Sequence, residues 1–189
     1  MSSLFGSTIN TRYLPLSSFR YIRSDVPDNL NEAEVQWLIT NKFLTIIDLR
    51  TIKEIEARPC TLRDRYEFRY LNIPITGGNS IPKCADEVYI SYLKMVDKTI
   101  WEIIRTIEES KSNVFYFCSA GKDRTGVVSA LLLSRIGATK EQIISDYVAS
   151  AENLEELLKL YAMQDPTVNT DIITPKALYM EQFWDHVAL

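Results

Sequence analysis

The stretch NVFYFCSAGKDRTGVVSALLLSRIG, residues 113–137, decides the fold. Residues 113–117 are a continuous apolar run of strand length, which is typical of a strand buried on both faces of a sheet. Residues 125–137 are mostly apolar, as in a buried helix, and they finish at Gly137, a residue type that commonly ends helices. A short polar loop joins the two. We therefore predict a strand–loop–helix unit over 113–137.

The remaining sequence also alternates between strand and helix patterns. Apolar runs or alternation predict strands at 17–23, 44–49 and 66–74. Helical spacing and capping patterns predict helices at 31–43, 51–58, 86–109, 140–150 and 153–163, and one more helix at the end of the tail. Asn31 with Glu34, and Thr139 with Gln142, have the spacing of capping boxes. This alternation predicts an α/β fold with a mainly parallel central sheet flanked by helices.

Length and composition limit the remaining possibilities. The 189 residues, of which 46% are hydrophobic and 24% charged, suit one globular domain spanning 1–189. A net charge of -4 argues against nucleic-acid binding. No apolar run approaches the length of a membrane span, and the first residues lack a secretory signal pattern. Cys60, Cys84 and Cys118 show no metal-type pairing, so we expect free thiols in a cytoplasmic protein.

The loop after the 113–117 strand has the residue types of an oxyanion site. Cys118 comes at the carboxyl end of the strand, where parallel sheets commonly bind ligands. A loop that leads from a strand into a helix can point several backbone N–H groups inward, and the helix adds its positive N-terminal end. Arg124 would contribute a planar fork that grips two phosphate oxygens. We predict that this loop binds inorganic phosphate, sulfate or a phosphoryl group.

The same features make Cys118 a candidate nucleophile. Helix N-termini and nearby cations lower the pKa of a cysteine thiol by about one to several units. A thiolate formed in this way at neutral pH can attack phosphorus. We prefer this interpretation to a buried structural cysteine beside a surface arginine.

The sequence CSAGKDRTG, residues 118–126, resembles the signature loop of cysteine-dependent protein tyrosine phosphatases. It is most similar to the bacterial tyrosine/serine phosphatase family, whose loop reads His-Cys-x-x-Gly-Lys-Asp-Arg-Thr-Gly. The segment IIDLRTIKEIEARP, 46–59, resembles that family's Asp-Leu-Arg segment with its following Glu. The segments YIRSD, 21–25, and INTRYL, 9–14, resemble its Arg-Ser and Asn-x-Arg segments. The resemblance implies a phosphatase-like α/β fold and a phosphocysteine reaction without metal or cofactor.

The resemblance also implies residue roles. Cys118 would be the nucleophile, Arg124 the phosphate clamp, and Thr125 the hydroxyl that hydrogen-bonds the cysteine sulfur. Backbone amides from Ser119 to Arg124 would line the site. The expected substrate-binding residues in the loop are Ser119, Ala120, Gly121 and Lys122, the last adding positive charge beside the phosphate.

For several residues the sequence leaves two interpretations of their role open. Asp123 is the first candidate for the general acid that protonates the leaving oxygen, and Asp86 is the second, although Asp86 can equally cap the helix predicted at 86–109. Asp48 and Arg50 would lie at the same sheet edge as Cys118, either contacting substrate or forming a buried ion pair. Phe117 stands where the family has histidine, which would make Cys118 less acidic than in relatives.

The function predicted is therefore a metal-independent phosphomonoesterase. Phosphotyrosine is the expected substrate, and phosphoserine or phosphothreonine are further candidates. The alternatives are a phosphoinositide or inositol-phosphate phosphatase, and a phosphate-binding module that has lost catalysis through Phe117. The loop 75–84 is either a lid or an ordinary connection, and Cys84 within it is a candidate disulfide partner for an oxidised Cys118.

Overall fold

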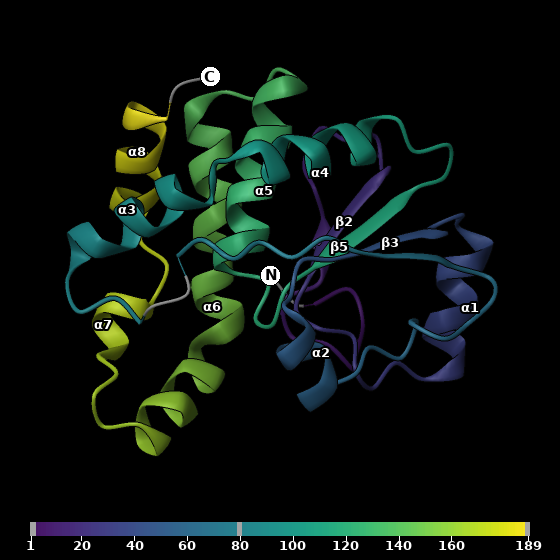
Figure 1. Cartoon of the computed structure of the whole chain (residues 1–189), viewed down its shortest axis with the longest axis horizontal. Coiled ribbons are helices and arrows are strands. Elements are labelled where there is room, and N and C mark those ends of the chain that lie inside the picture. Colours follow the sequence, from purple (N-terminus) through teal and green to yellow (C-terminus); the bar gives the residue numbers. More distant parts are fainter. Residues whose placement is uncertain (1–2, 79–80, 188–189) are drawn as a thin grey trace.

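The computed structural model describes residues 3–78 and 81–187, and its centre is a five-stranded sheet (Figure 1). The strand order is β1–β2–β5–β3–β4, and only the pair β1–β2 is antiparallel. The mainly parallel sheet is thus confirmed. Its strands are β1 (Arg12–Tyr13), β2 (Tyr21–Ser24), β3 (Thr45–Asp48), β4 (Arg69–Asn72) and β5 (Val114–Phe117).

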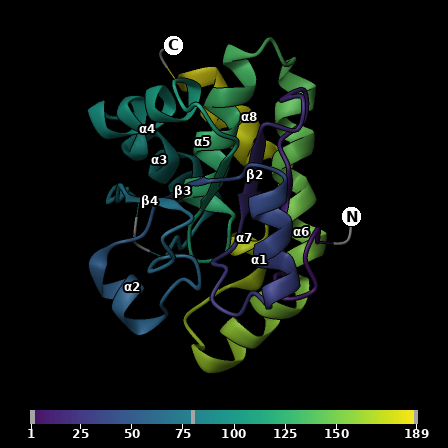
Figure 2. The ribbon, with the colours of Figure 1, turned by 90° about the vertical axis from the view of Figure 1, so that its right-hand side faces the viewer.

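Helices cover both faces of the sheet (Figures 1 and 2). Helices α3, α4, α5, α6 and α8 lie on one face, and α1 packs on the other. The bounds are α1 Glu32–Thr40, α2 Ile52–Ala57, α3 Ala85–Met95, α4 Lys98–Glu108, α5 Asp123–Arg135, α6 Lys140–Gln164, α7 Thr170–Ile173 and α8 Ala177–His186.

The central strand β5 shows why the apolar run predicted a strand buried on both faces. Val114 and Tyr116 join the apolar cluster beneath α4 and α5, whereas Phe115 and Phe117 join the cluster beneath α1. All four side chains are fully buried. Because successive strand side chains point to opposite faces, a strand between two helical layers must be apolar at every position. This strand carries the chain directly into Cys118.

Several helix predictions are confirmed, with differences at their ends. Both predicted capping boxes are present, at Asn31 and at Thr139. The span predicted as one helix at 86–109 is two helices, because Asp97 accepts hydrogen bonds from the amides of Thr99 and Ile100 and starts α4. The helices predicted at 140–150 and 153–163 are instead one continuous helix, α6. The tail contains two helices, α7 and α8, where one was expected.

The strand predictions were less accurate at the edges of the sheet. The strand predicted at 66–74 begins only at Arg69, and Tyr66 is 96% exposed. The strand predicted at 17–23 is shifted to β2, and its antiparallel neighbour β1 was not predicted. Edge strands are short and make few contacts, so their sequence pattern is weak.

The first part of the 75–84 loop packs against α3. A Cβ added to Gly77 would lie 2.3 Å from the carbonyl oxygen of Lys94, so only glycine fits there. The carbonyl of Gly78 accepts a hydrogen bond from the Ser91 hydroxyl at 3.1 Å. The lid prediction extends over residues 79 and 80, which lie outside the described residues.

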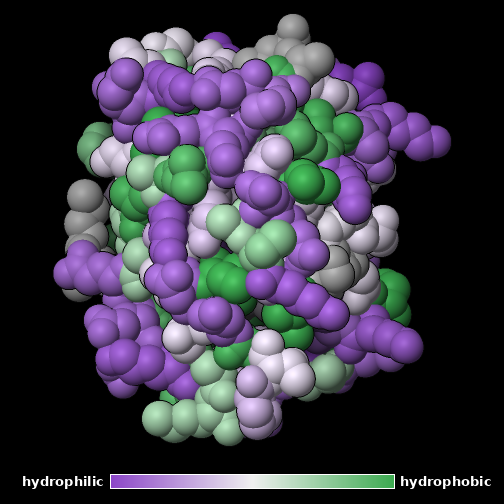
Figure 3. Space-filling view, turned by 90° about the vertical axis from the view of Figure 1, so that its left-hand side faces the viewer, coloured by the Kyte–Doolittle hydropathy of each residue, from purple (hydrophilic) through white to green (hydrophobic). Residues whose placement is uncertain are grey.

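The surface near these helices is mixed in character. Figure 3 shows apolar residues scattered among hydrophilic ones on the face that carries α3, α7 and α8. Ile90 on α3 and Leu178 on α8 are among the exposed apolar side chains. Within the described ranges no helix has the length and apolar character needed to cross a bilayer.

Candidate active site

Cys118 lies where the sheet and α5 meet. It follows the last residue of β5, which runs between β2 and β3, and the loop 119–122 then leads into α5. Its side chain is almost fully buried, with the residue 3% exposed. The sequence prediction that Cys118 comes at the carboxyl end of a central parallel strand is therefore confirmed. A sulfur atom in this position lies below whatever the loop binds.

The carbonyl groups of the loop are held on its outer side. The amide of Val26 donates to the carbonyl of Ser119 at 3.2 Å. The Asn10 side-chain amide donates to the carbonyls of Ala120 and Gly121 at 3.0 and 3.1 Å. By contrast, the amides of residues 119–124 donate no hydrogen bond to any described group. The loop therefore presents a set of unused donors, as an oxyanion site requires.

Gly121 allows the loop to approach β2 closely. Its φ of 67° lies in the left-handed region that side chains disfavour. A Cβ at this position would lie 2.5 Å from the carbonyl carbon and oxygen of Ser24. The glycine in the signature is thus required both by the backbone conformation and by the lack of space.

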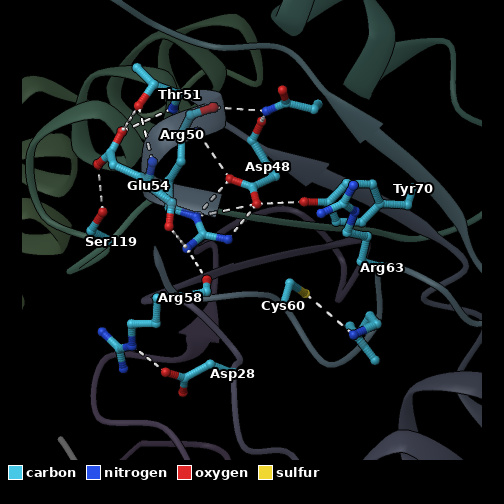
Figure 4. Close-up of polar contacts among 12 residues, drawn as sticks. Asp28, Asp48, Arg50, Thr51, Glu54, Arg58, Cys60, Arg63, Tyr70 and Ser119 are labelled. Carbon is cyan, nitrogen blue, oxygen red and sulfur yellow. Dashed lines mark hydrogen bonds and ion pairs between the residues drawn. The ribbon is translucent and has the colours of Figure 1, made fainter. Parts of the chain in front are cut away.

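Arg124 is paired with a carboxylate that the sequence analysis did not assign to the site. Its two terminal nitrogens donate to the two oxygens of Glu54 at 2.8 and 2.6 Å. The hydroxyl of Ser119 donates to Glu54 at 2.8 Å, a contact drawn in Figure 4. Glu54 comes from the first turn of α2, where it also forms a capping box with Thr51. This capping box was a sequence signal that could have revealed Glu54.

Glu54 and Arg124 each stabilise the charged form of the other. Burial acts to raise the pKa of Glu54, but the hydrogen bonds from Arg124, the Thr51 amide and Ser119 outweigh it and hold the pKa well below its usual value. Burial acts to lower the pKa of Arg124, but Glu54 and the nearby Cys118 raise it overall. Arg124 is therefore a fixed cation beside the sulfur.

Asp123 is tied to two buried tyrosines. Its carboxylate accepts a hydrogen bond of 2.6 Å from the Tyr92 hydroxyl, which in turn lies 2.7 Å from the Tyr147 hydroxyl. The Asp123 side chain remains 41% exposed. Helices α3 and α6 thus fix the first candidate for the general acid while leaving it open to solvent.

Lys122 makes a contact that its charge alone did not predict. Its ammonium group is buried and donates to the carbonyl of Ile173 in α7 at 2.6 Å. It also lies 3.5 Å from the carboxylate of Asp123. In this arrangement Lys122 joins the loop to α7 and lies beside Asp123.

Asp48 and Arg50 form a fully buried ion pair (Figure 4). Arg50 donates to both carboxylate oxygens of Asp48 and to the carbonyl of Arg58, and Tyr70 donates to Asp48 at 2.6 Å. The Arg50 guanidinium also lies over the Phe117 ring, 5.3 Å from its centroid. This burial favours the ion-pair interpretation over direct substrate contact. It also shows that an arginine covers the residue at the family's histidine position.

Other candidates lie apart from these contacts. The Thr125 hydroxyl is buried and forms no hydrogen bond with any described group, the sulfur of Cys118 included. Asp86 is exposed in the first turn of α3, and the N-cap of that helix is Cys84, so the capping role considered for Asp86 is wrong.

Cys84 is exposed and its thiol is not in a disulfide. Burial raises the pKa of the third thiol, Cys60, to about 12.

Two surface hollows lie away from Cys118. One, of about 540 Å³, lies between α6 and α7, and the other, of about 710 Å³, lies at the amino ends of β3 and β4. No residue from 118 to 124 lines either hollow. The chemistry of the Cys118 loop, not the size of a cavity, therefore identifies the site.

Comparison with known proteins gives consistent results. The chain is 32% identical over 145 residues to a tyrosine-protein phosphatase of Nostoc commune, a match that covers 71% of this chain and 49% of the relative. It is 25% identical over 184 residues to a putative tyrosine-protein phosphatase of Cupriavidus necator, with 86% and 66% covered. The chain thus spans between about half and two thirds of the length of these curated relatives. A crystal structure of a putative phosphatase from Neisseria meningitidis is 18% identical, with a TM-score of 0.49 and 76% of this chain and 92% of that chain covered.

A family model described as the tyrosine phosphatase family matches residues 11–189, which include the Cys118 loop and all the residues described around it except Asn10. The chain therefore belongs to the tyrosine phosphatase family.

Proposed function

We propose that the chain is a phosphoric monoester hydrolase that acts through a phosphocysteine intermediate on Cys118. One observation carries this proposal: the carbonyls from Ser119 to Gly121 are all bonded on the outer side of the loop, and the amides beside Cys118 remain unused. Such a set of amides, together with the guanidinium of Arg124, matches the oxygens of a phosphoryl group.

In the first step the thiolate of Cys118 attacks phosphorus in line with the leaving oxygen. A sulfur–phosphorus bond forms as the ester bond breaks, and the leaving oxygen takes a proton from Asp123. The loop amides and Arg124 stabilise the charge on the three non-bridging oxygens. Asp123 suits this role because it is partly exposed and oriented by Tyr92.

In the second step water attacks the phosphocysteine. Asp123, now a carboxylate, accepts a proton from that water, and the sulfur–phosphorus bond breaks to give inorganic phosphate and the free thiolate. The Thr125 hydroxyl is proposed to donate to the departing sulfur. Its support is that the hydroxyl is buried and forms no hydrogen bond in this structure, so it is free to turn toward the sulfur.

The proposal is tested by hydrolysis of p-nitrophenyl phosphate in the presence of a chelator. Cys118→Ser should abolish turnover, because a serine hydroxyl stays protonated at neutral pH and is a weaker nucleophile. Cys84→Ser is the matched control, since Cys84 is an exposed thiol, and it should keep full activity. Turnover that persists in Cys118→Ser, or that requires a metal, would overturn the proposal.

Phosphotyrosine is the proposed substrate. The family and the names of its relatives support this choice, and the loop itself recognises only the phosphoryl group. Side-by-side kcat/KM values for a phosphotyrosine peptide, a phosphoserine peptide and a phosphoinositide test it. A higher value for phosphoserine or phosphoinositide would replace the substrate but leave the Cys118 chemistry in place.

A phosphate-binding module without turnover is a second candidate, which Phe117 favours. Its ring lies under Arg50 and is fully buried, so it cannot supply the hydrogen bond of a histidine to the loop. Binding of a phosphopeptide with no hydrolysis under reducing conditions would favour this candidate. Measurable turnover by the wild-type protein would exclude it.

A further inference from the structure

We propose that Asn10 and Arg23 are positioning residues that set the direction of the amides in the Cys118 loop. The inference rests on the proposed function, in which those amides bind a phosphoryl group. Neither side chain is expected to touch the substrate. Each acts through the loop backbone, from the side facing away from the site.

Asn10 contacts two consecutive peptide groups of the loop. Its side-chain nitrogen lies 3.0 Å from the carbonyl oxygen of Ala120 and 3.1 Å from that of Gly121. Asn10 is fully buried, so water does not compete for these bonds. An amide nitrogen has two protons, and here both can point at the loop.

Arg23 holds the second of these carbonyls more strongly. One terminal nitrogen donates to the carbonyl of Gly121 at 2.7 Å, and the other pairs with the carboxylate of Asp146. Arg23 is fully buried, and a charged donor makes roughly twice the contribution of a neutral one. The guanidinium therefore connects the loop to α6 through one rigid group.

The direction of a carbonyl determines the direction of the next amide. A peptide unit is planar and trans, so its C=O and N–H point in opposite directions. Fixing the carbonyls of Ala120 and Gly121 outward consequently fixes the N–H groups of Gly121 and Lys122 on the opposite side. Without Asn10 and Arg23 these two peptide units could rotate and lose the shared direction that an oxyanion needs.

Both positioning residues are themselves held by a buried network. Arg12 donates to the backbone carbonyl and the side-chain oxygen of Asn10, and it pairs with Asp146. The hydroxyl of Ser150 lies 3.3 Å from the Asn10 nitrogen and 3.0 Å from Arg12. Thr45 at the amino end of β3 is also buried, and its hydroxyl lies within hydrogen-bond distance of the Ser110 and Ser112 hydroxyls, outside this network, which makes it a suitable control.

The test uses Asn10→Leu and Arg23→Lys, neither of which changes the net charge. Asn10→Leu has a similar shape but no donors, and Arg23→Lys keeps a cation near Asp146 but cannot reach both partners at once. We expect the affinity for inorganic phosphate, and kcat/KM for p-nitrophenyl phosphate, to fall at least about tenfold in each, because buried carbonyls lose their donors. Thr45→Val, which also removes the hydrogen bonds of a buried side chain, should match the wild-type protein in both measurements.

A second measurement needs no ligand and no turnover. The ¹⁵N–¹H signals of residues 119–122 should shift or broaden in Asn10→Leu and Arg23→Lys, and should stay in place in Thr45→Val. If one variant does not fold, the other carries the test. Unchanged loop signals together with unchanged phosphate affinity would overturn the inference. If the wild-type protein binds no phosphate, the proposed function fails, and the ligand-free signals alone decide whether Asn10 and Arg23 position the loop.

Discussion

At the scale of single residues, the ion pair with Glu54 fixes the orientation of Arg124, the proposed phosphate-binding arginine. Glu54 contacts both terminal nitrogens of the guanidinium, so in the proposed mechanism the remaining N–H groups would make the phosphate contacts. A side chain as flexible as arginine loses less entropy on binding when one edge is already fixed. In the proposed mechanism Glu54 would therefore act on catalysis through the orientation of Arg124.

We predict that Glu54→Gln lowers stability and kcat/KM together. The variant should lose about 1–2 kcal/mol at pH 7, since a bidentate charged pair that is partly exposed is replaced by a weaker neutral contact. The pKa of Glu54 in the folded protein lies below its unfolded value of 4.5. The ion pair therefore stabilises the folded state fully above pH 4.5, and this stabilisation declines as the pH falls below 4.5. Urea denaturation at pH 7 and pH 3 measures the difference. An equal difference at both values would contradict the prediction.

Gly121 gives a second test at this scale. Gly121→Ala combines left-handed strain with a clash of 2.5 Å against Ser24, whereas Gly137→Ala has a φ of 85° and nothing within 4 Å. We expect Gly137→Ala to cost about 1 kcal/mol, the strain alone, and Gly121→Ala to cost clearly more and to abolish phosphate binding. Thermal unfolding and phosphate titration of both variants provide the comparison. Phosphate binding retained in Gly121→Ala would show that the loop can adapt.

At the scale of secondary-structure elements, the break between α3 and α4 shows how one capping residue competes with periodicity. The apolar spacing across 86–109 continues through the break, which is why it predicted one helix. Asp97 instead adopts an extended conformation and accepts from two amides at the start of α4. Asp86, the residue considered as a cap from the sequence, is two positions inside α3.

This difference predicts unequal effects for two aspartates. Asp97→Ala should destabilise the protein by about 1 kcal/mol, because the amides of Thr99 and Ile100 lose their acceptor. Asp86→Ala should cost only a few tenths of that, about 0.3 kcal/mol, through the helix dipole. Chemical denaturation of both variants distinguishes them. Equal costs would mean that Asp97 does not act as a cap.

At the scale of the whole molecule, one buried carboxylate ties the two halves of the chain together. Asp146 in α6 pairs with Arg12 of β1 and Arg23 of β2, and the three side chains are almost fully buried. Burial and the neighbouring Arg23 lower the pKa of Arg12 to about 10, while Asp146 acts in the opposite direction. In the network behind the Cys118 loop, Asp146 is the carboxylate that pairs with both guanidinium groups.

We predict that Asp146→Asn costs about 3–5 kcal/mol, because two buried guanidinium groups lose their counter-charge while the shape of the side chain is kept. Asp185→Asn is the control: Asp185 pairs with Lys140 on the surface, where a pair contributes at most about 1 kcal/mol. Urea denaturation of the two variants measures both costs. A small loss for Asp146→Asn would indicate that water or another group replaces the carboxylate.

The sequence by itself determined the central unit of the protein. The strand β5, the loop after it and the start of α5 follow from contiguous residues, and so does the prediction that Cys118 belongs to an anion-binding loop. Apolar runs, glycines and capping residues act locally, so their effect can be inferred without knowing the rest of the fold. The same reasoning predicted the buried strand β3 and the capping boxes at Asn31 and Thr139.

The tertiary structure alone decided which distant side chains support that unit. Glu54, Asn10 and Arg23 lie about 65 to 110 residues from the loop atoms they contact. No local sequence pattern predicts which face of β2 or α2 contacts the Cys118 loop, because this depends on how the whole sheet packs. The sequence therefore predicted the cysteine loop and its chemistry, whereas packing between distant segments determined which side chains hold the backbone of that loop.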